Sequence, residues 1–257
     1  MSKVAVTAVE RVLDIVEAFR AARRPLSLTD LATAVRTPKS SCHAIVATLL
    51  ARGYLYTLSR PRALYPTRRL HDLSREILEH DPFIEQAMPL LEALRDATRE
   101  TVIFGKRQGH GVVYLQVVQG AHPIRYSAAP GEIKPLHSSA IGKAMLGTLK
   151  DAELRVLLES LPLPAVTGAT LTGARALLDD LARGRKQGYY VTRGENVADV
   201  WAVAASLVIN GEALAVAVAG PGNRMQAGLR DCAQQVVGTC SLLAQQTGAR
   251  TSEDGLI

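Results

Sequence analysis

Small polar and basic side chains gather between residues 37 and 43. Helical spacing would put four of them on one solvent-facing side, namely Lys39, Ser40, Ser41 and His43. Such groups can hydrogen-bond the edges of bases in a DNA groove. If the segment opens a helix, its first N–H groups and the positive end of its dipole also attract phosphate. The chemistry predicted for these residues is therefore recognition of a nucleic acid.

The first third of the chain carries the whole net charge. Residues 1–80 contain 13 Lys and Arg against 7 Asp and Glu, whereas residues 81–257 contain 17 of each kind. A neutral body with one basic lobe is expected of a protein that docks on a polyanion. A merely solvated, Arg-rich surface would give the same count, so charge alone leaves both interpretations open.

Three helices are predicted in the basic lobe. Apolar residues at helical spacing indicate the first helix over residues 4–19. Ser27 and Asp30 form a capping-box pattern at the start of a second, short helix. Thr37 is the expected cap of the third helix, with Pro38 at its first position, where the missing N–H costs nothing. The two short helices with a tight turn between them are typical of a helix-turn-helix.

A basic hairpin is predicted after the third helix, which should stop at Gly53. The apolar pattern then changes to period two over residues 54–58 and 63–65. Arg60 and Arg62 at the tip could touch phosphate or enter the minor groove. Two helices and a hairpin can also form a small core that binds nothing. The agreement of order, spacing and charge favours a winged helix-turn-helix that binds DNA.

The neutral remainder mixes helices with strands. A linker helix is predicted over 70–81, and a new helix should begin at Asp81 and Pro82. Strands are then predicted over 101–106, 111–118 and 123–127, followed by a loop over 130–137 and a helix over 139–149. The next predicted helix is capped by Thr170 or Thr172 and ends near Gln187. Strands over 188–193, 201–209 and 213–219 and a helix over 224–246 complete the prediction. Antiparallel strands with flanking helices give an α+β domain.

Several classes of protein are disfavoured by what the sequence lacks. It contains no apolar stretch of membrane-spanning length, no secretory leader pattern and no C-x-x-C pair. It also lacks the G-x-S-x-G, P-loop and dinucleotide-binding patterns. His137 has no second metal ligand at suitable spacing, so we interpret it as a hydrogen bonder between loop and helix. We expect a cytoplasmic protein that is not an enzyme, with no catalytic residue, cofactor or metal. Trp201 could line a pocket or lie in the core.

Segments in both halves of the chain resemble the IclR family of bacterial transcriptional regulators. They are residues 37–41 and 47–54, the run 135–146, and then Gly188-Tyr189, Glu195, Ala204-Ala205 and Gly220-Pro221. The resemblance covers nearly the whole chain in order. It departs from the family's frequent residues at Arg36 and Asp199 (Gly in many members), at Ala44 (Arg) and at Ser206 (Pro).

The resemblance implies an α+β protein with three parts. These are a winged helix-turn-helix over 1–69, a linker helix over 70–81, and a GAF-like effector-binding and oligomerisation domain over 82–257. The implied function is an effector-responsive regulator that binds a double-stranded DNA operator as a homodimer or a dimer of dimers. The N-terminal and linker helices would form the dimer seam. The alternative is a small-molecule sensor that acts through protein partners, with the winged helix only as a packing module.

Candidate site residues follow from the motif and from the resemblance. The expected DNA contacts are Ser27, Arg36, Thr37, Pro38, Lys39, Ser40, Ser41, His43, Arg60 and Arg62. The effector contacts implied by the family are Phe104, Tyr126, Ser139, Ala140, Ile141, Thr192, Glu195, Val200, Ala202, Ser206, Ala217 and Ala219.

The strand positions among the effector contacts suggest the kind of ligand. Relatives that bind small acids often have Ser or Cys where this chain has alanine, and losing those hydroxyls makes the cavity larger and more apolar. Ser138 and Ser139 open a helix whose N–H groups could receive an anionic or carbonyl oxygen. We therefore expect an effector larger than a two- or three-carbon acid, such as an aromatic acid. The plain alternative is that these alanines pack the core.

Overall fold

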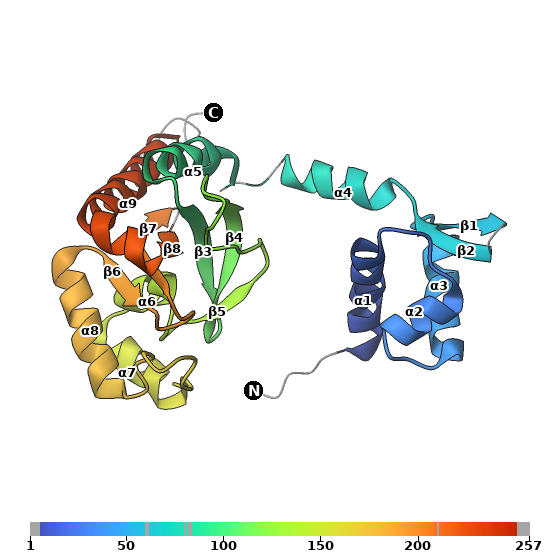
Figure 1. Ribbon diagram of the computed structural model, residues 1–257, viewed down its shortest axis with the longest axis horizontal. Coiled ribbons are helices and arrows are strands. Elements are labelled where there is room, and N and C mark those ends of the chain that lie inside the picture. Colours follow the sequence, from blue (N-terminus) through green and yellow to red (C-terminus); the bar gives the residue numbers. More distant parts are fainter. Residues whose placement is uncertain (1–5, 60–61, 80, 82–83, 210, 251–257) are drawn as a thin grey trace. The chain divides into compact units, whose positions relative to one another are not determined.

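The computed structural model describes residues 6–59, 62–79, 81, 84–209 and 211–250. The chain divides into two compact units, residues 1–81 and residues 82–257 (Figure 1). None of the helices in the described part of the chain is long and apolar enough to cross a membrane.

The first unit is three helices, a two-stranded hairpin and a fourth helix. They are α1 (Thr7–Ala22), α2 (Leu28–Ala34), α3 (Lys39–Ala51), β1 (Leu55–Ser59), β2 (Arg62–Pro66) and α4 (Arg69–Leu78). Ile15, Phe19, Leu31 and Cys42 are buried together in its core. Leu64 of the hairpin joins this core and pairs with Leu26 as an isolated β-bridge. The predicted order of helix, helix-turn-helix and wing is confirmed.

The start of α2 is capped as predicted, but the start of α3 is not. The Ser27 hydroxyl accepts the N–H of Asp30, and the Asp30 carboxylate accepts the N–H of Ser27, which completes a capping box. At α3, Pro38 takes the cap position and no side chain caps the helix. Thr37 was the wrong choice of cap, because its hydroxyl is buried with no partner among the described residues.

The second unit is built on a six-stranded antiparallel sheet in the order β5-β4-β3-β8-β7-β6 (Figure 1). Its elements are α5 (Ile84–Thr98), β3 (Thr101–Gln108), β4 (Gly111–Val118), β5 (Ile133–Pro135), α6 (Ala140–Gly147), α7 (Asp151–Ser160), α8 (Ala174–Gln187), β6 (Tyr190–Arg193), β7 (Val200–Ile209), β8 (Glu212–Pro221) and α9 (Gly222–Arg250). The unit has the predicted α+β architecture.

Helices cover both faces of this sheet, and each face has its own apolar core. Side chains from α5 and α9 bury one face, where Leu91 and Val236 pack against Phe104 and Val216. Residues of α6 and α8 bury the other face, where Ile141 packs among Ile103, Ala204 and Ala217. Because both faces are covered, the central strands are apolar at nearly every position.

The structure corrects the sequence predictions in four places. Residues 123–127 form no strand; the short edge strand is β5, inside the segment predicted as a loop. Helix α7 was not predicted. Neither Thr170 nor Thr172 caps α8, which begins after Gly173 without a side-chain cap. The Thr170 hydroxyl instead donates to the carbonyl of Glu195. The predicted role of Pro82 lies outside the described residues.

Candidate nucleic-acid interface and effector cavity

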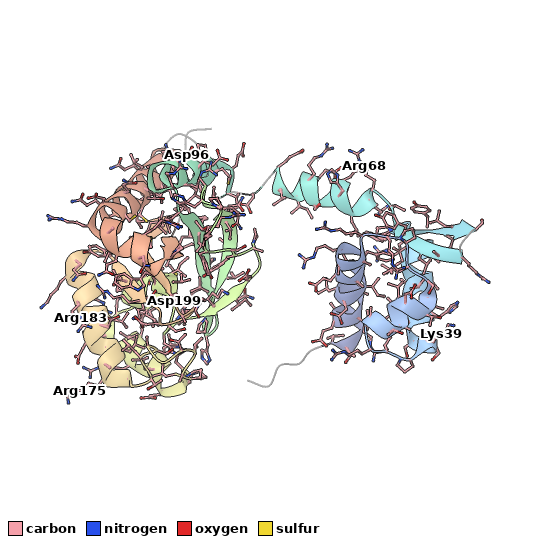
Figure 2. The ribbon with its side chains drawn as sticks, in the orientation of Figure 1. Lys39, Arg68, Asp96, Arg175, Arg183 and Asp199 are labelled. Carbon is pink, nitrogen blue, oxygen red and sulfur yellow. The ribbon has the colours of Figure 1, made fainter. Side chains whose placement is uncertain are left out.

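The first turns of α3 present the polar face that the sequence predicts. Lys39, Ser40 and His43 are exposed, and Ser41 is half-buried. Figure 2 shows Lys39 at the surface of the first unit. Cys42 between them is fully buried, so it fixes the rotation of the helix and keeps its polar neighbours turned outward.

Three cations of the first unit have no anionic partner among the described residues. Arg36, Lys39 and Arg62 are exposed and take part in no ion pair within the described part of the chain. By contrast, Arg24 and Arg68 lie 3.8 Å and 3.2 Å from carboxylates of their own unit. The unpaired charges are free to neutralise phosphates.

The turn between α2 and α3 passes through Arg36 in the left-handed region, at φ 48°. Many relatives have glycine here according to the resemblance above, and only glycine adopts this conformation without strain. Arg36 therefore combines a strained backbone conformation with an exposed, unpaired guanidinium.

Not every predicted DNA contact is available. Thr37 is buried, so its side chain cannot reach a base. The Ser27 hydroxyl is already bonded to Asp30, both as donor and as acceptor. Pro38 is exposed but has no N–H to offer. Arg60 lies outside the described residues.

The second unit holds a small cavity between α6 and the sheet. Eight of the predicted effector contacts line it: Tyr126, Ser139, Ile141, Thr192, Val200, Ala202, Ala217 and Ala219. Its volume is about 30 Å³. A buried water needs at least ~10–15 Å³ by this measure, so the cavity as it stands holds only water-sized molecules.

Four further residues complete the lining, and the sequence did not single them out. They are Ile103, Tyr114, Asn196 and Val197. Ile103 and Tyr114 lie on strands buried on both sides, which hides which residues face the cavity. Asn196 and Val197 lie in an irregular loop with no periodicity to read. No charged side chain lines the cavity within the described chain.

Four predicted effector contacts do not line the cavity. Phe104 was placed on the wrong face of the sheet, because it packs in the core beneath α5 and α9. Ala140 is buried in the core on the cavity side. Ser206 pairs with Ala215, further along β7 than the lining residue Ala202. Glu195 turns away from the cavity toward Lys143.

Backbone N–H groups at the start of α6 lie next to the lining residues Ser139 and Ile141. The Ser139 hydroxyl accepts the N–H of Gly142 and donates to the carbonyl of Pro135, so its one proton is not available to a ligand. The N–H groups of Ala140 and Ile141, in the first turn, have no partner inside the helix. These two donors and the helix dipole can receive a negatively charged oxygen, as the sequence predicts.

A buried ion triad lies behind the cavity. Lys143 is fully buried, and its Nζ lies 2.6 Å from Asp180 Oδ2 and 2.7 Å from Glu195 Oε2. Burial raises the pKa of Glu195 above its ordinary 4.5, although Lys143 acts in the opposite direction. The triad ties α6 to α8 and to the loop that carries Asn196.

His137 and Trp201 lie outside the cavity lining. His137 is buried, and its Nε2 lies 3.0 Å from the carbonyl of Pro164. Because a carbonyl only accepts, this nitrogen must carry the proton. His137 is thus a hydrogen bonder as predicted, but its partner Pro164 lies in the loop between α7 and α8 and not in a helix. Trp201 packs at the edge of the core beneath α9, with the Arg193 guanidinium 5.3 Å from its ring.

A winged helix-turn-helix with exposed cations, in one chain with an α+β unit that encloses a cavity, defines the class of ligand-responsive DNA-binding regulators. Comparison with known families agrees. The model for the IclR helix-turn-helix domain matches residues 8–59, and the model for the bacterial transcriptional regulator IclR C-terminal domain matches residues 75–244. The chain belongs to the IclR family of bacterial transcriptional regulators, and it is not an enzyme.

Individual relatives support this assignment. The transcriptional regulator BhcR of Paracoccus denitrificans is 33% identical over 224 residues, which cover 86% of this chain and 79% of that protein. The transcriptional regulator XynR of Escherichia coli is 31% identical over 207 residues, covering 77% and 79%. The alternative of a sensor that acts only through protein partners has no support among them.

Solved structures share the fold over most of the chain. Thermotoga maritima IclR matches with a TM-score of 0.80 at 20% identity, covering 95% of this chain and all of that one. An IclR homologue from Microbacterium hydrocarbonoxydans, crystallised with 4-hydroxybenzoate, matches with a TM-score of 0.76 at 21% identity, covering 94% and 99%.

Proposed function

We propose that this regulator reads its operator with the first turns of α3, paired with a second copy of the chain on a pseudo-palindromic site. Lys39, Ser40, Ser41 and His43 would enter the major groove, while Arg60 and Arg62 would hold the flanking backbone. The observation that carries this proposal is the exposed, unpaired cationic face around Lys39. We expect the protein to bind its operator in the cytoplasm, where bacterial DNA lies.

The double substitution Lys39→Ala and Ser40→Ala tests the reading helix. It should abolish specific operator binding while leaving effector binding unchanged, since α3 belongs to the first unit. The control is Lys150→Ala, which removes one exposed lysine from the second unit. Loss of Lys39 alone should also lower the slope of log K against log salt by about 1. Operator affinity that survives the double substitution would show that α3 is not the reading helix.

We propose that the dimer seam is formed by α1 and α4. Val9 and Leu13 of α1 are 57% and 60% exposed, and Ile77 and Leu78 of α4 are 71% and 61% exposed. Apolar side chains this exposed favour burial against a partner. Leu13→Arg should shift sedimentation toward the monomer; an unchanged sedimentation coefficient would place the seam elsewhere. A dimer of dimers would require a second interface in the other unit.

We propose a small organic acid as the effector, and an aromatic acid in particular. Its carboxylate would bind the N–H groups at the start of α6, and its apolar part would pack on Ala202, Ala217 and Ala219. The homologue crystallised with 4-hydroxybenzoate supports this choice of ligand class. Calorimetric titration should rank aromatic acids above pyruvate and glyoxylate, and the reverse ranking would reject the proposal.

The size of the cavity gives this effector a route to regulation. At about 30 Å³ the cavity is far too small for an aromatic ring, so binding must move a wall. A ligand that binds only the open form shifts the population toward it. Coupling to DNA follows only if the open and closed forms also differ in operator affinity. Effector added to an operator complex should therefore change the Kd for the operator. An unchanged Kd would show that effector binding and DNA binding are not coupled.

A further inference from the structure

Two phenol hydroxyls lie at the cavity beside strand β5. Tyr114, on β4, is 3% exposed, and Tyr126 is half-buried in the segment between β4 and β5. Both side chains line the cavity, and Tyr126 is near enough to Tyr114 to raise the pKa of its phenol. The cavity thus has a polar group besides the start of α6, and the effector site proposed above gives it no role.

A half-buried cation lies beside the two phenols. Lys134 of β5 has a side chain that is 22% exposed, with its Nζ 2.8 Å from Glu132 Oε2 and 6.0 Å from the centre of the Tyr114 ring. Burial alone would lower the pKa of Lys134, but Glu132 and Tyr126 together raise it. The ammonium is therefore charged, and it lies close to the Tyr114 ring.

The phenols can offer a hydrogen-bond donor to a ligand. Burial first, and then Tyr126, raise the pKa of Tyr114, so its phenol stays neutral. Lys134 can only donate, so it cannot accept the Tyr114 proton. Because both phenols line the cavity, a ligand oxygen there can accept a phenol proton.

We propose that the Tyr114–Tyr126 pair, polarised by Lys134, is a second polar subsite that selects acids bearing another oxygen function. This inference rests on the effector site proposed above. The carboxylate would bind at α6, and a hydroxyl or carbonyl oxygen elsewhere on the ligand would accept a phenol proton. The apolar lining between the two subsites would hold the carbon skeleton. The class of effector is thus a hydroxy or keto acid, and among aromatic acids a hydroxylated one.

Matched ligand pairs and Tyr→Phe variants test this subsite. The probes are benzoate with 4-hydroxybenzoate and phenylacetate with 4-hydroxyphenylacetate, titrated calorimetrically into the full chain. The wild type should bind the hydroxylated member of at least one pair roughly 10-fold more tightly, as expected for about one buried hydrogen bond. Tyr114→Phe and Tyr126→Phe should each abolish that preference and leave the affinity for the unhydroxylated acid unchanged.

Tyr189→Phe is the matched control, because Tyr189 packs against the core on the opposite face of the sheet. It should keep the wild-type preference. Equal wild-type binding of both members of each pair, or equal weakening of both by Tyr126→Phe, would overturn the second subsite while leaving the acid-binding site in place. If none of the four acids bound, the proposed aromatic effector would fail and the inference would fail with it. Circular dichroism of each variant verifies folding.

Discussion

Replacing Lys143 by methionine should destabilise the second unit by about 3 kcal/mol, at the lower end of the range for breaking a buried ion pair. Lys143 is fully buried between Asp180 and Glu195. Asp180 keeps a second partner, because Arg183 Nη2 lies 2.8 Å from its Oδ1. Glu195, whose side chain is only 11% exposed, has no other ion pair among the described residues. The lost energy is therefore mainly that of one uncompensated carboxylate.

Urea unfolding can measure this loss in the right unit. Trp201 is the only tryptophan of the chain and lies on β7, so its fluorescence follows the second unit alone. For a unit of this size, 3 kcal/mol corresponds to a fall in Tm of roughly 6–12 °C. Circular dichroism follows both units and serves as the comparison.

A double-mutant cycle separates the lost ion pair from lost packing. Adding Glu195→Gln to Lys143→Met removes the stranded charge, so most of the stability should return. If Lys143→Met costs less than about 1 kcal/mol, or if the second substitution restores nothing, the triad is not a coupled ion pair and the reasoning is refuted.

Two further predictions concern backbone strain and pH. Arg36→Gly should stabilise the first unit by about 1 kcal/mol, because glycine relieves the positive φ. The same change should weaken DNA binding and lower its salt slope by about 1 if this guanidinium contacts phosphate; thermal unfolding and salt titrations check both effects. The raised pKa of Glu195 means that the folded chain holds this proton more tightly than the unfolded chain does. Its contribution to stability should therefore fall as pH rises from 4.5 through the folded pKa, and Glu195→Gln should remove that part of the pH dependence.

The first unit could be predicted closely from sequence because its elements are half-exposed. On a surface helix the alternation of apolar and polar residues marks the buried side, and the polar face of α3 was identified this way. The cap of α3 was harder to predict, because Pro38 occupies the cap position that was predicted for Thr37. Only the tertiary contacts decided which residue was buried.

The sheet of the second unit shows where sequence patterns fail. Residues 101–105 of β3 are all buried, so no alternation distinguishes Ile103, on the cavity side, from Phe104, on the other. A shift of one residue exchanges the two faces. Glu195 was assigned to the effector because a loop carboxylate carries no sign of its partner; Lys143 lies 52 residues earlier in the chain. Short β5 was missed because three residues give no period.

The wall that opens for an effector can be inferred from the bonds that hold each side. The loop carrying Asn196 is fixed by the charged bond between Lys143 and Glu195. Two kinds of bond hold the segment carrying Tyr126: the neutral Thr101 Oγ1 donates to the Tyr126 carbonyl at 2.5 Å, and the exposed Arg224 Nη2 donates to the carbonyl of Ile124 at 2.8 Å. Bonds from exposed charged groups contribute little to stability, whereas the Lys143–Glu195 bond is buried, so the Tyr126 segment should yield first.

Two substitutions distinguish these walls by effector affinity. Thr101→Val removes the neutral bond, lowers the energy needed to open the cavity, and should tighten binding of an acid by up to roughly 10-fold. Glu195→Gln should leave the Kd within about twofold, because the wall that it holds stays closed. If Glu195→Gln tightened binding and Thr101→Val did not, the opposite wall would be the one that moves. In that case the segment that opens would not be the one that carries the Tyr126 phenol.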